Sequence, residues 1–181
     1  GLCVSLVSGS FASAQAVPGP DSGHWPFDGH LRDASGNGNH AYGDDPAYAE
    51  GRRGQGLVCD GSPVTVPDAP GVRLAPGLQV ESWVQPHAIG TSWQPILIKE
   101  DEYQLRIDPP VEGGQFSFFA HLGQWEPRVR SPVVAEVGTW YHLKAGWTGE
   151  TVWIEVNGER AERARTGQPF PSGEPLLFGR F

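Results

Sequence analysis

Acidic side chains are the first candidates for catalysis, because glycoside hydrolysis requires two carboxyl groups about 5 to 10 Å apart. Two carboxylates on one strand can act together only from the same face, and successive side chains alternate between faces. The densest acidic cluster, Glu100-Asp101-Glu102, is consecutive and directly precedes the strand-like residue Tyr103. We interpret it as a solvated turn, so no catalytic pair of carboxylates is indicated.

Other catalytic arrangements are matched poorly. Polysaccharide β-elimination combines a base, an acid and a group that neutralises a carboxylate. Two segments come nearest to such an arrangement. In the first, Gln85-Pro86-His87, Pro86 would end the strand rather than lie within it. The other, Glu159–Arg163, is typical of an exposed, charged strand. No G-x-S-x-G motif occurs, and the six His residues lack H-x-H or H-E-x-x-H spacing. The sequence therefore predicts no catalytic residue and no zinc site.

One glycine-rich loop offers oxygen ligands of the kind that calcium prefers. Asp33, Asn37 and Asn39 supply one carboxylate and two side-chain amides. The alternative is an Asx-turn loop, in which the Asp33 carboxylate accepts hydrogen bonds from backbone N–H groups. Both interpretations stay open, and calcium is the only cofactor that the sequence suggests.

Sugar recognition requires aromatic side chains and polar groups on an exposed surface. Trp93 and Trp125 stand among Ser, Thr, Gly and Gln rather than in alternating apolar runs, which predicts loops. Packing in the core is the alternative for both. Arg130 would share a strand face with Arg128 and could contact an acidic glycan or form a solvated edge. The candidate ligand-binding residues are Trp93, Gln94, Gln124, Trp125 and Arg128.

Composition limits the classes of partner. The 181 residues suffice for one domain with a full core. The net charge is −8, and the thirteen Lys and Arg residues form no basic stripe. Such a chain is poorly suited to nucleic acid or to an anionic membrane surface. Many Gly and Pro residues together with many aromatic ones favour short strands joined by tight turns.

The first sixteen residues carry no charge and end in Ala14-Gln15-Ala16, which is typical of a signal-peptide cleavage site. We expect residues 1–16 to be the C-terminal part of a signal peptide and residues 17–21 a linker. The chain would then be secreted, extracellular, surface-bound or periplasmic. A flexible N-terminal linker is the alternative. Cleavage would remove Cys3, and Cys59 would remain as a small buried apolar residue.

Alternation of apolar and polar residues predicts strands throughout residues 22–181. Within them, Trp83 and Trp153 fall on the outward parity, where they could form an aromatic surface for a sugar or pack against loops that cover the sheet. Asn157-Gly158 indicates a tight hairpin turn. The predicted strands lie around residues 57–59, 64–66, 78–85, 96–98, 103–107, 116–120, 128–130, 141–147, 152–156, 159–163 and 176–178.

Six ordered motifs carry a family resemblance: residues 24–29, 33–40, 54–61, 78–86, 139–143 and 152–158. They resemble the laminin-G-like jelly-roll domains of bacterial secreted proteins, within the concanavalin A-like lectin/glucanase superfamily. The resemblance implies an all-β, antiparallel sandwich over residues 22–181. Family members usually end with one further strand after the segment that corresponds to Leu177-Phe178-Gly179, so we expect that strand to be missing here.

The resemblance implies a non-catalytic recognition module whose expected partner is a glycan or an extracellular protein. Carbohydrate binding, with or without calcium, is the first hypothesis. A glycoside hydrolase or polysaccharide lyase of the same fold is the second, although the E-x-D-x-x-E motif of glucan-hydrolysing relatives is absent. A protein-binding adhesion or spacer domain is the third. A separate catalytic domain elsewhere in the parent protein is compatible with all three.

Overall fold

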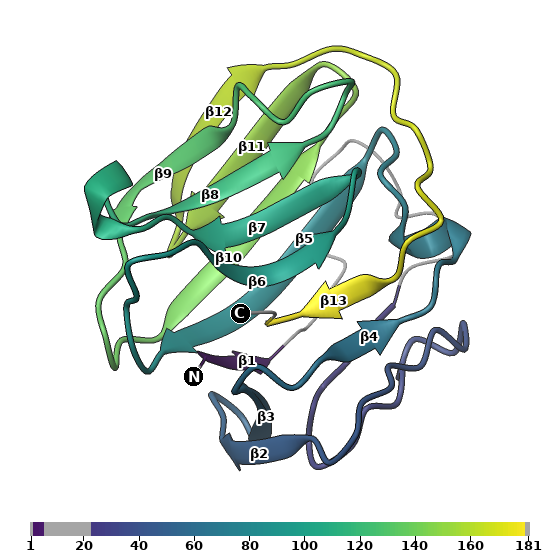
Figure 1. The fold of residues 1–181 in the computed structure, drawn as a ribbon, viewed down its shortest axis with the longest axis vertical. Helices are drawn as coiled ribbons and strands as arrows, with labels where there is room; N and C mark the ends of the chain where they lie inside the picture. Colours follow the sequence, from purple (N-terminus) through teal and green to yellow (C-terminus); the bar gives the residue numbers. More distant parts are fainter. Residues whose placement is uncertain (1, 6–22, 180–181) are drawn as a thin grey trace.

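Two antiparallel β-sheets stacked face to face form the fold (Figure 1). The computed structural model describes the backbone of residues 2–5 and the whole of residues 23–179. The seven-stranded sheet has the order β12 (Glu159–Ala164), β11 (Thr151–Val156), β10 (Tyr141–Trp147), β5 (Leu78–Pro86), β1 (Leu2–Ser5), β3 (Gln55–Cys59) and β2 (Ala47–Glu50).

The six-stranded sheet faces the viewer in Figure 1. Its order is β4 (Val64–Val66), β13 (Leu176–Phe178), β6 (Gln94–Lys99), β7 (Tyr103–Ile107), β8 (Gln115–Ala120) and β9 (Val129–Val134). Two short 3-10 helices, η1 (Pro70–Val72) and η2 (Pro110–Glu112), interrupt the strands. The described residues contain no α-helix, which confirms the predicted all-β, antiparallel sandwich of concanavalin A type.

The core fills the space between the sheets, and the predicted alternation determines which side chains enter it. Leu105 on β7 and Phe118 on β8 are opposite each other and buried, as is Leu143 on β10. Trp147 is also fully buried, and its Nε1–H donates to the carbonyl of Arg165 at 2.8 Å. Cys59 is buried, as expected for a small apolar residue.

The acidic turn after β6 differs from its sequence interpretation. Glu102 is 1% exposed and is therefore not a solvated loop residue. Its carboxylate accepts the N–H of Leu74 at 2.7 Å and lies 3.2 Å from Nζ of Lys99. Lys99 is itself fully buried and also pairs with Asp68 at 2.7 Å. These partners compensate the loss of hydration that burial of a charge imposes.

The N-terminal segment enters the fold through β1, which lies between β5 and β3 in the seven-stranded sheet. Most of the expected signal peptide (1–16) and the linker (17–21) lies outside the described residues, and that expectation stays a prediction. Within the described part of the chain, no helix is long and apolar enough to cross a membrane.

Candidate ligand-binding face

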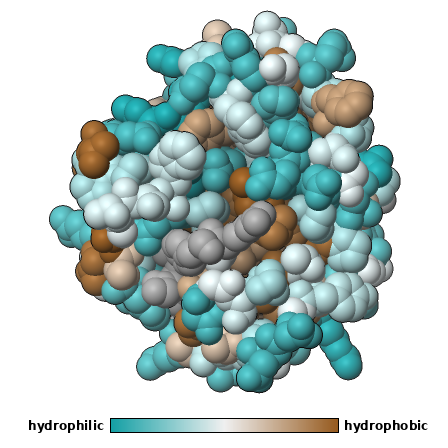
Figure 2. Space-filling model, viewed as in Figure 1, coloured by the Kyte–Doolittle hydropathy of each residue, from teal (hydrophilic) through white to brown (hydrophobic). Residues whose placement is uncertain are grey.

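The outward side of the six-stranded sheet carries a row of polar side chains that register places next to one another. Arg106 on β7 lies opposite Ser117 on β8, and Ser117 lies opposite Arg130 on β9. Their neighbours Leu105 and Phe118 point into the core, so alternation turns this row away from it. Figure 2 shows the face, which is mostly hydrophilic with hydrophobic side chains near the middle.

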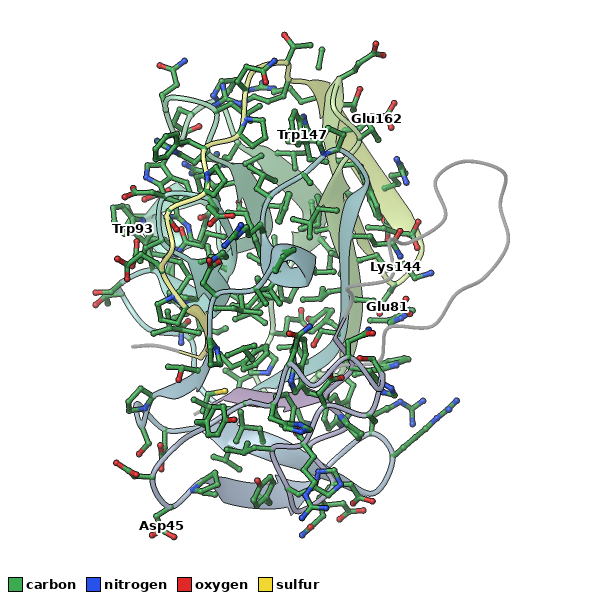
Figure 3. All side chains as sticks on the ribbon, turned by 90° about the vertical axis from the view of Figure 1, so that its right-hand side faces the viewer. Asp45, Glu81, Trp93, Lys144, Trp147 and Glu162 are labelled. Carbon is green, nitrogen blue, oxygen red and sulfur yellow. The ribbon has the colours of Figure 1, made fainter. Side chains whose placement is uncertain are left out.

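Trp93 projects from this face and is 58% exposed (Figure 3). It lies in the loop before β6, as its polar neighbours predicted. Its Nε1–H donates to Oε1 of Glu112 at 2.8 Å. The guanidinium carbon of Arg106 lies 4.6 Å from the centre of its ring, in cation–π geometry. An exposed indole is thus fixed both at its edge and on one of its faces.

Arg106 links Trp93 to a second aromatic residue. Its guanidinium carbon lies 4.4 Å from the ring centre of Phe119, over which Arg128 also lies at 5.4 Å. The Trp125 ring meets Phe119 edge-on at 6.3 Å. The fold therefore brings together three of the predicted residues, Trp93, Trp125 and Arg128. We call the group formed by Trp93, Arg106, Asp108, Glu112, Phe119, Trp125 and Arg128 the Trp93 cluster.

A buried carboxylate holds the arginines of the cluster. Asp108 is fully buried; its Oδ1 lies 2.7 Å from Nε of Arg106, and Oδ2 accepts the hydroxyl of Ser117 at 2.6 Å. Arg128 and Arg130 approach the same carboxylate at 3.2 and 3.6 Å. A buried ion is stable only when charge and hydrogen bonds compensate its lost hydration. Asp108 therefore determines where the guanidinium groups lie.

Two more carboxylates neutralise the arginines near the surface. Glu112 lies 2.5 Å from Nη2 of Arg128, and Glu126 lies 2.5 Å from its Nη1. The hydrogen bond from Trp93, opposed by burial and aided by Arg128 and Arg106, lowers the pKa of Glu112. The pKa of Glu126 is also lowered, because hydrogen bonds from Arg128 outweigh the opposing effect of burial. Both groups are therefore anionic at neutral pH.

The two predicted glutamines lie at the margin of the cluster. Gln94 is buried; its Oε1 accepts the N–H of Gly90 at 3.0 Å, and its Nε2 donates to the carbonyl of Ala88 at 3.1 Å. Its amide therefore shapes the loop that carries Trp93. Gln124 is exposed beside Trp125 and offers its side chain to solvent.

Sequence reasoning missed four members of the cluster: Arg106, Asp108, Glu112 and Phe119. Arg106 on β7 and Asp108 directly after its end share the same parity, and this alternation was the available signal. Glu112 and Phe119 could not be assigned without the strand register.

The outward side of the seven-stranded sheet has its own aromatic residues. Trp83 stacks on His142 with ring centres 4.7 Å apart, and Arg52 lies over its ring at 5.1 Å. Trp153 is buried beneath Arg160, whose guanidinium carbon lies 4.3 Å from its ring centre. Both have the outward parity that was predicted, and both are covered by side chains from neighbouring strands and loops. Neither indole is as exposed as that of Trp93.

The Asp33 loop has the geometry of an Asx-turn. Oδ1 of Asp33 accepts the N–H groups of His24 and Ser35 at 2.9 and 2.8 Å. Oδ2 accepts the Ser35 hydroxyl at 2.8 Å and the N–H of Asn39 at 2.9 Å. These four donors are the hydrogen bonds that the Asx-turn alternative predicts, and they satisfy both oxygens of the carboxylate. Within residues 23–179, no group of three or more His, Cys, Asp or Glu residues could hold a metal.

Comparison with known proteins agrees with this architecture. A family model described as the concanavalin A-like lectin/glucanases superfamily matches residues 60–180, and the chain belongs to that superfamily. No curated protein sequence matches the chain.

Among solved structures, domain 4 of AbnA, a GH43 extracellular arabinanase from Geobacillus stearothermophilus in complex with arabinotriose, is similar in fold. The match has a TM-score of 0.70 and 21% identity over 88% of this chain and 82% of that one. The carbohydrate-binding module CBM66 from Bacillus subtilis matches with a TM-score of 0.46 and 12% identity over 77% of this chain and 91% of that one.

Proposed function

We propose that this chain is a non-catalytic carbohydrate-recognition module that binds its glycan on the Trp93 cluster. The observation that carries the proposal is the fixed, exposed indole of Trp93. A ring held by Arg106 and Glu112 needs no reordering before a sugar stacks on it, which lowers the entropic cost of binding. The charged groups around it can donate to and accept from hydroxyl groups.

The similar architecture of the arabinanase domain that binds arabinotriose supports this class of function. A module of this kind would act outside the cell, in keeping with the predicted signal peptide. The carboxylates of the cluster argue against hydrolysis, since Asp108 is fully buried and Glu112 and Glu126 are each paired with Arg128. A general acid needs a raised pKa, whereas the pKa values of both glutamates are lowered.

Titration calorimetry against a panel of oligosaccharides that includes arabinotriose tests the proposal. We expect binding by the wild type and a loss of at least about tenfold in affinity for Trp93→Ala, as for a central aromatic contact. Trp83→Ala makes the same substitution on the opposite sheet and should retain binding. Failure of every glycan to bind, or equal binding by Trp93→Ala, contradicts the proposal. Release of reducing sugar or unsaturated uronate would favour an enzyme instead.

A further inference from the structure

A groove of about 460 Å³ lies where the edge strands of the two sheets approach each other. β9 and β12 belong to different sheets but run side by side at one margin of the sandwich (Figure 1). The groove is lined by Glu126, Arg128, Val129, Arg130, Ala161, Glu162 and Arg163. Because Arg128 belongs to both, the groove is continuous with the Trp93 cluster.

The acidic side chains of the groove already have close basic partners. Oε1 of Glu126 lies 2.5 Å from Nη1 of Arg128. Oε2 of Glu162 lies 3.3 Å from Nε of Arg160, which stands on the same strand outside the groove lining. Neither carboxylate is therefore left to neutralise the other guanidinium groups of the groove.

Arg130 and Arg163 are held much less closely. The carboxylates nearest to Arg130 are those of Asp108 at 3.6 Å and Glu112 at 3.9 Å, both beyond hydrogen-bond distance. Its side chain is 44% exposed. Arg163 is exposed on β12, and no carboxylate among residues 23–179 forms an ion pair with it. Two guanidinium groups thus face the groove with N–H donors available to a ligand.

We infer that this groove binds the carboxylates of an acidic glycan, so that the ligand of the proposed surface is a uronate-containing chain; this inference rests on the proposed function. Three arginines against two glutamates leave the lining with a formal charge of +1, in a chain whose net charge is −8. Guanidinium groups match the planar geometry of carboxylates through paired hydrogen bonds. Ala161, which is partly exposed, provides apolar surface for the sugar ring beside these groups.

Paired probes that differ only in charge test the inference: oligogalacturonate and oligoglucuronate, each as the free acid and as the methyl ester. We expect the wild type to bind at least one acid about tenfold or more tightly than its ester, the equivalent of one charge-assisted hydrogen bond. Added salt should reduce this preference. The double variant Arg130→Gln/Arg163→Gln should bind acid and ester equally. Arg53→Gln, in the exposed turn between β2 and β3 at the other end of the seven-stranded sheet, is the control and should keep the preference.

Several results would overturn the inference while the proposed function stands. One is a wild type that binds acid and ester equally, with Trp93→Ala abolishing both. Another is binding of neutral oligosaccharides alone through Trp93. A preference for acids that survives in the double variant also overturns the inference, because groups other than Arg130 and Arg163 would then bind the carboxylates. Absence of all glycan binding overturns the proposed function and the inference together. Melting temperatures of the variants establish that they fold.

Discussion

Asp108 and Arg106 form an ion pair 2.7 Å apart, with the carboxylate fully buried and the guanidinium nearly so. The pair has a consequence at the surface, because the same guanidinium supports the ring of Trp93. A buried charge therefore determines the position of an exposed aromatic side chain. Substitutions below the surface should consequently change binding at it.

Replacing Asp108 tests this link. Asp108→Asn leaves a side chain of similar shape without the charge that Arg106 needs. Removing one partner of a buried ion pair costs about 3–5 kcal/mol. We expect the free energy of unfolding to fall by about 3 kcal/mol and glycan affinity to fall with it at temperatures where the variant is folded. Urea denaturation provides the measurement, with Asp45→Asn in an exposed loop as the control (Figure 3). Unchanged stability would show that the pair contributes nothing.

A series of three tryptophan variants separates binding from packing. Trp93→Ala should cost less than about 1 kcal/mol of stability, as surface substitutions do. Trp147→Ala should cost about 3–5 kcal/mol, because that ring is fully buried. Trp125→Ala should fall between them, since the ring is half-buried against Phe119 and His121. Thermal melts of the three variants measure the order of their stability losses. A large fall in the melting temperature of Trp93→Ala would show that the ring has a structural role.

Acid should weaken the fold through Asp68. A hydrogen bond from Arg73, opposed by burial and aided by Lys99, lowers the pKa of Asp68 to about 2. A carboxyl whose pKa is depressed on folding stabilises the protein above its unfolded pKa of about 3.9. That contribution, about 2 kcal/mol in all, is lost as the pH falls towards about 2.

Arg73→Gln should raise the pKa of Asp68 towards its ordinary value. The variant should therefore lose about 1 kcal/mol less stability than the wild type between about pH 5 and about pH 2. Denaturation curves across this range provide the measurement, and Arg53→Gln in an exposed turn is the control. Parallel curves for wild type and Arg73→Gln would contradict the assignment.

Calcium should leave the melting temperature unchanged, because the four donors around Asp33 occupy its carboxylate. Burial raises the pKa of Asp33, but the hydrogen bonds to its carboxylate lower the pKa by more than burial raises it. The group is therefore anionic without a metal. Asp33→Ala should cost about 1–3 kcal/mol by leaving N–H groups without partners. If calcium instead raises the melting temperature of the wild type and Asp33→Ala abolishes this rise, the loop must rearrange to bind the ion.

The sequence by itself determined the strands and their faces. A strand's alternation is a local property with a period of two. The burial of Leu105, Phe118 and Leu143 could therefore be predicted without information about the neighbouring strands. The polar surroundings of Trp93 likewise predicted an exposed loop. Among the strands of the described residues, only β2 and β1 were not anticipated, and β2 carries little alternation of buried and exposed residues.

The tertiary structure alone decided which polar side chains meet. Glu102 appeared to be part of a solvated turn, yet it compensates Lys99 and caps the backbone of a distant loop at Leu74. Glu112 reaches Trp93 from η2, and Phe119 lies beneath Arg106 because β7 and β8 pair in one particular register. Strand register and loop packing depend on contacts between residues far apart in the chain. Local periodicity carries no information about these contacts. The candidate site could therefore be identified only from the register and packing of the sheets in the tertiary structure.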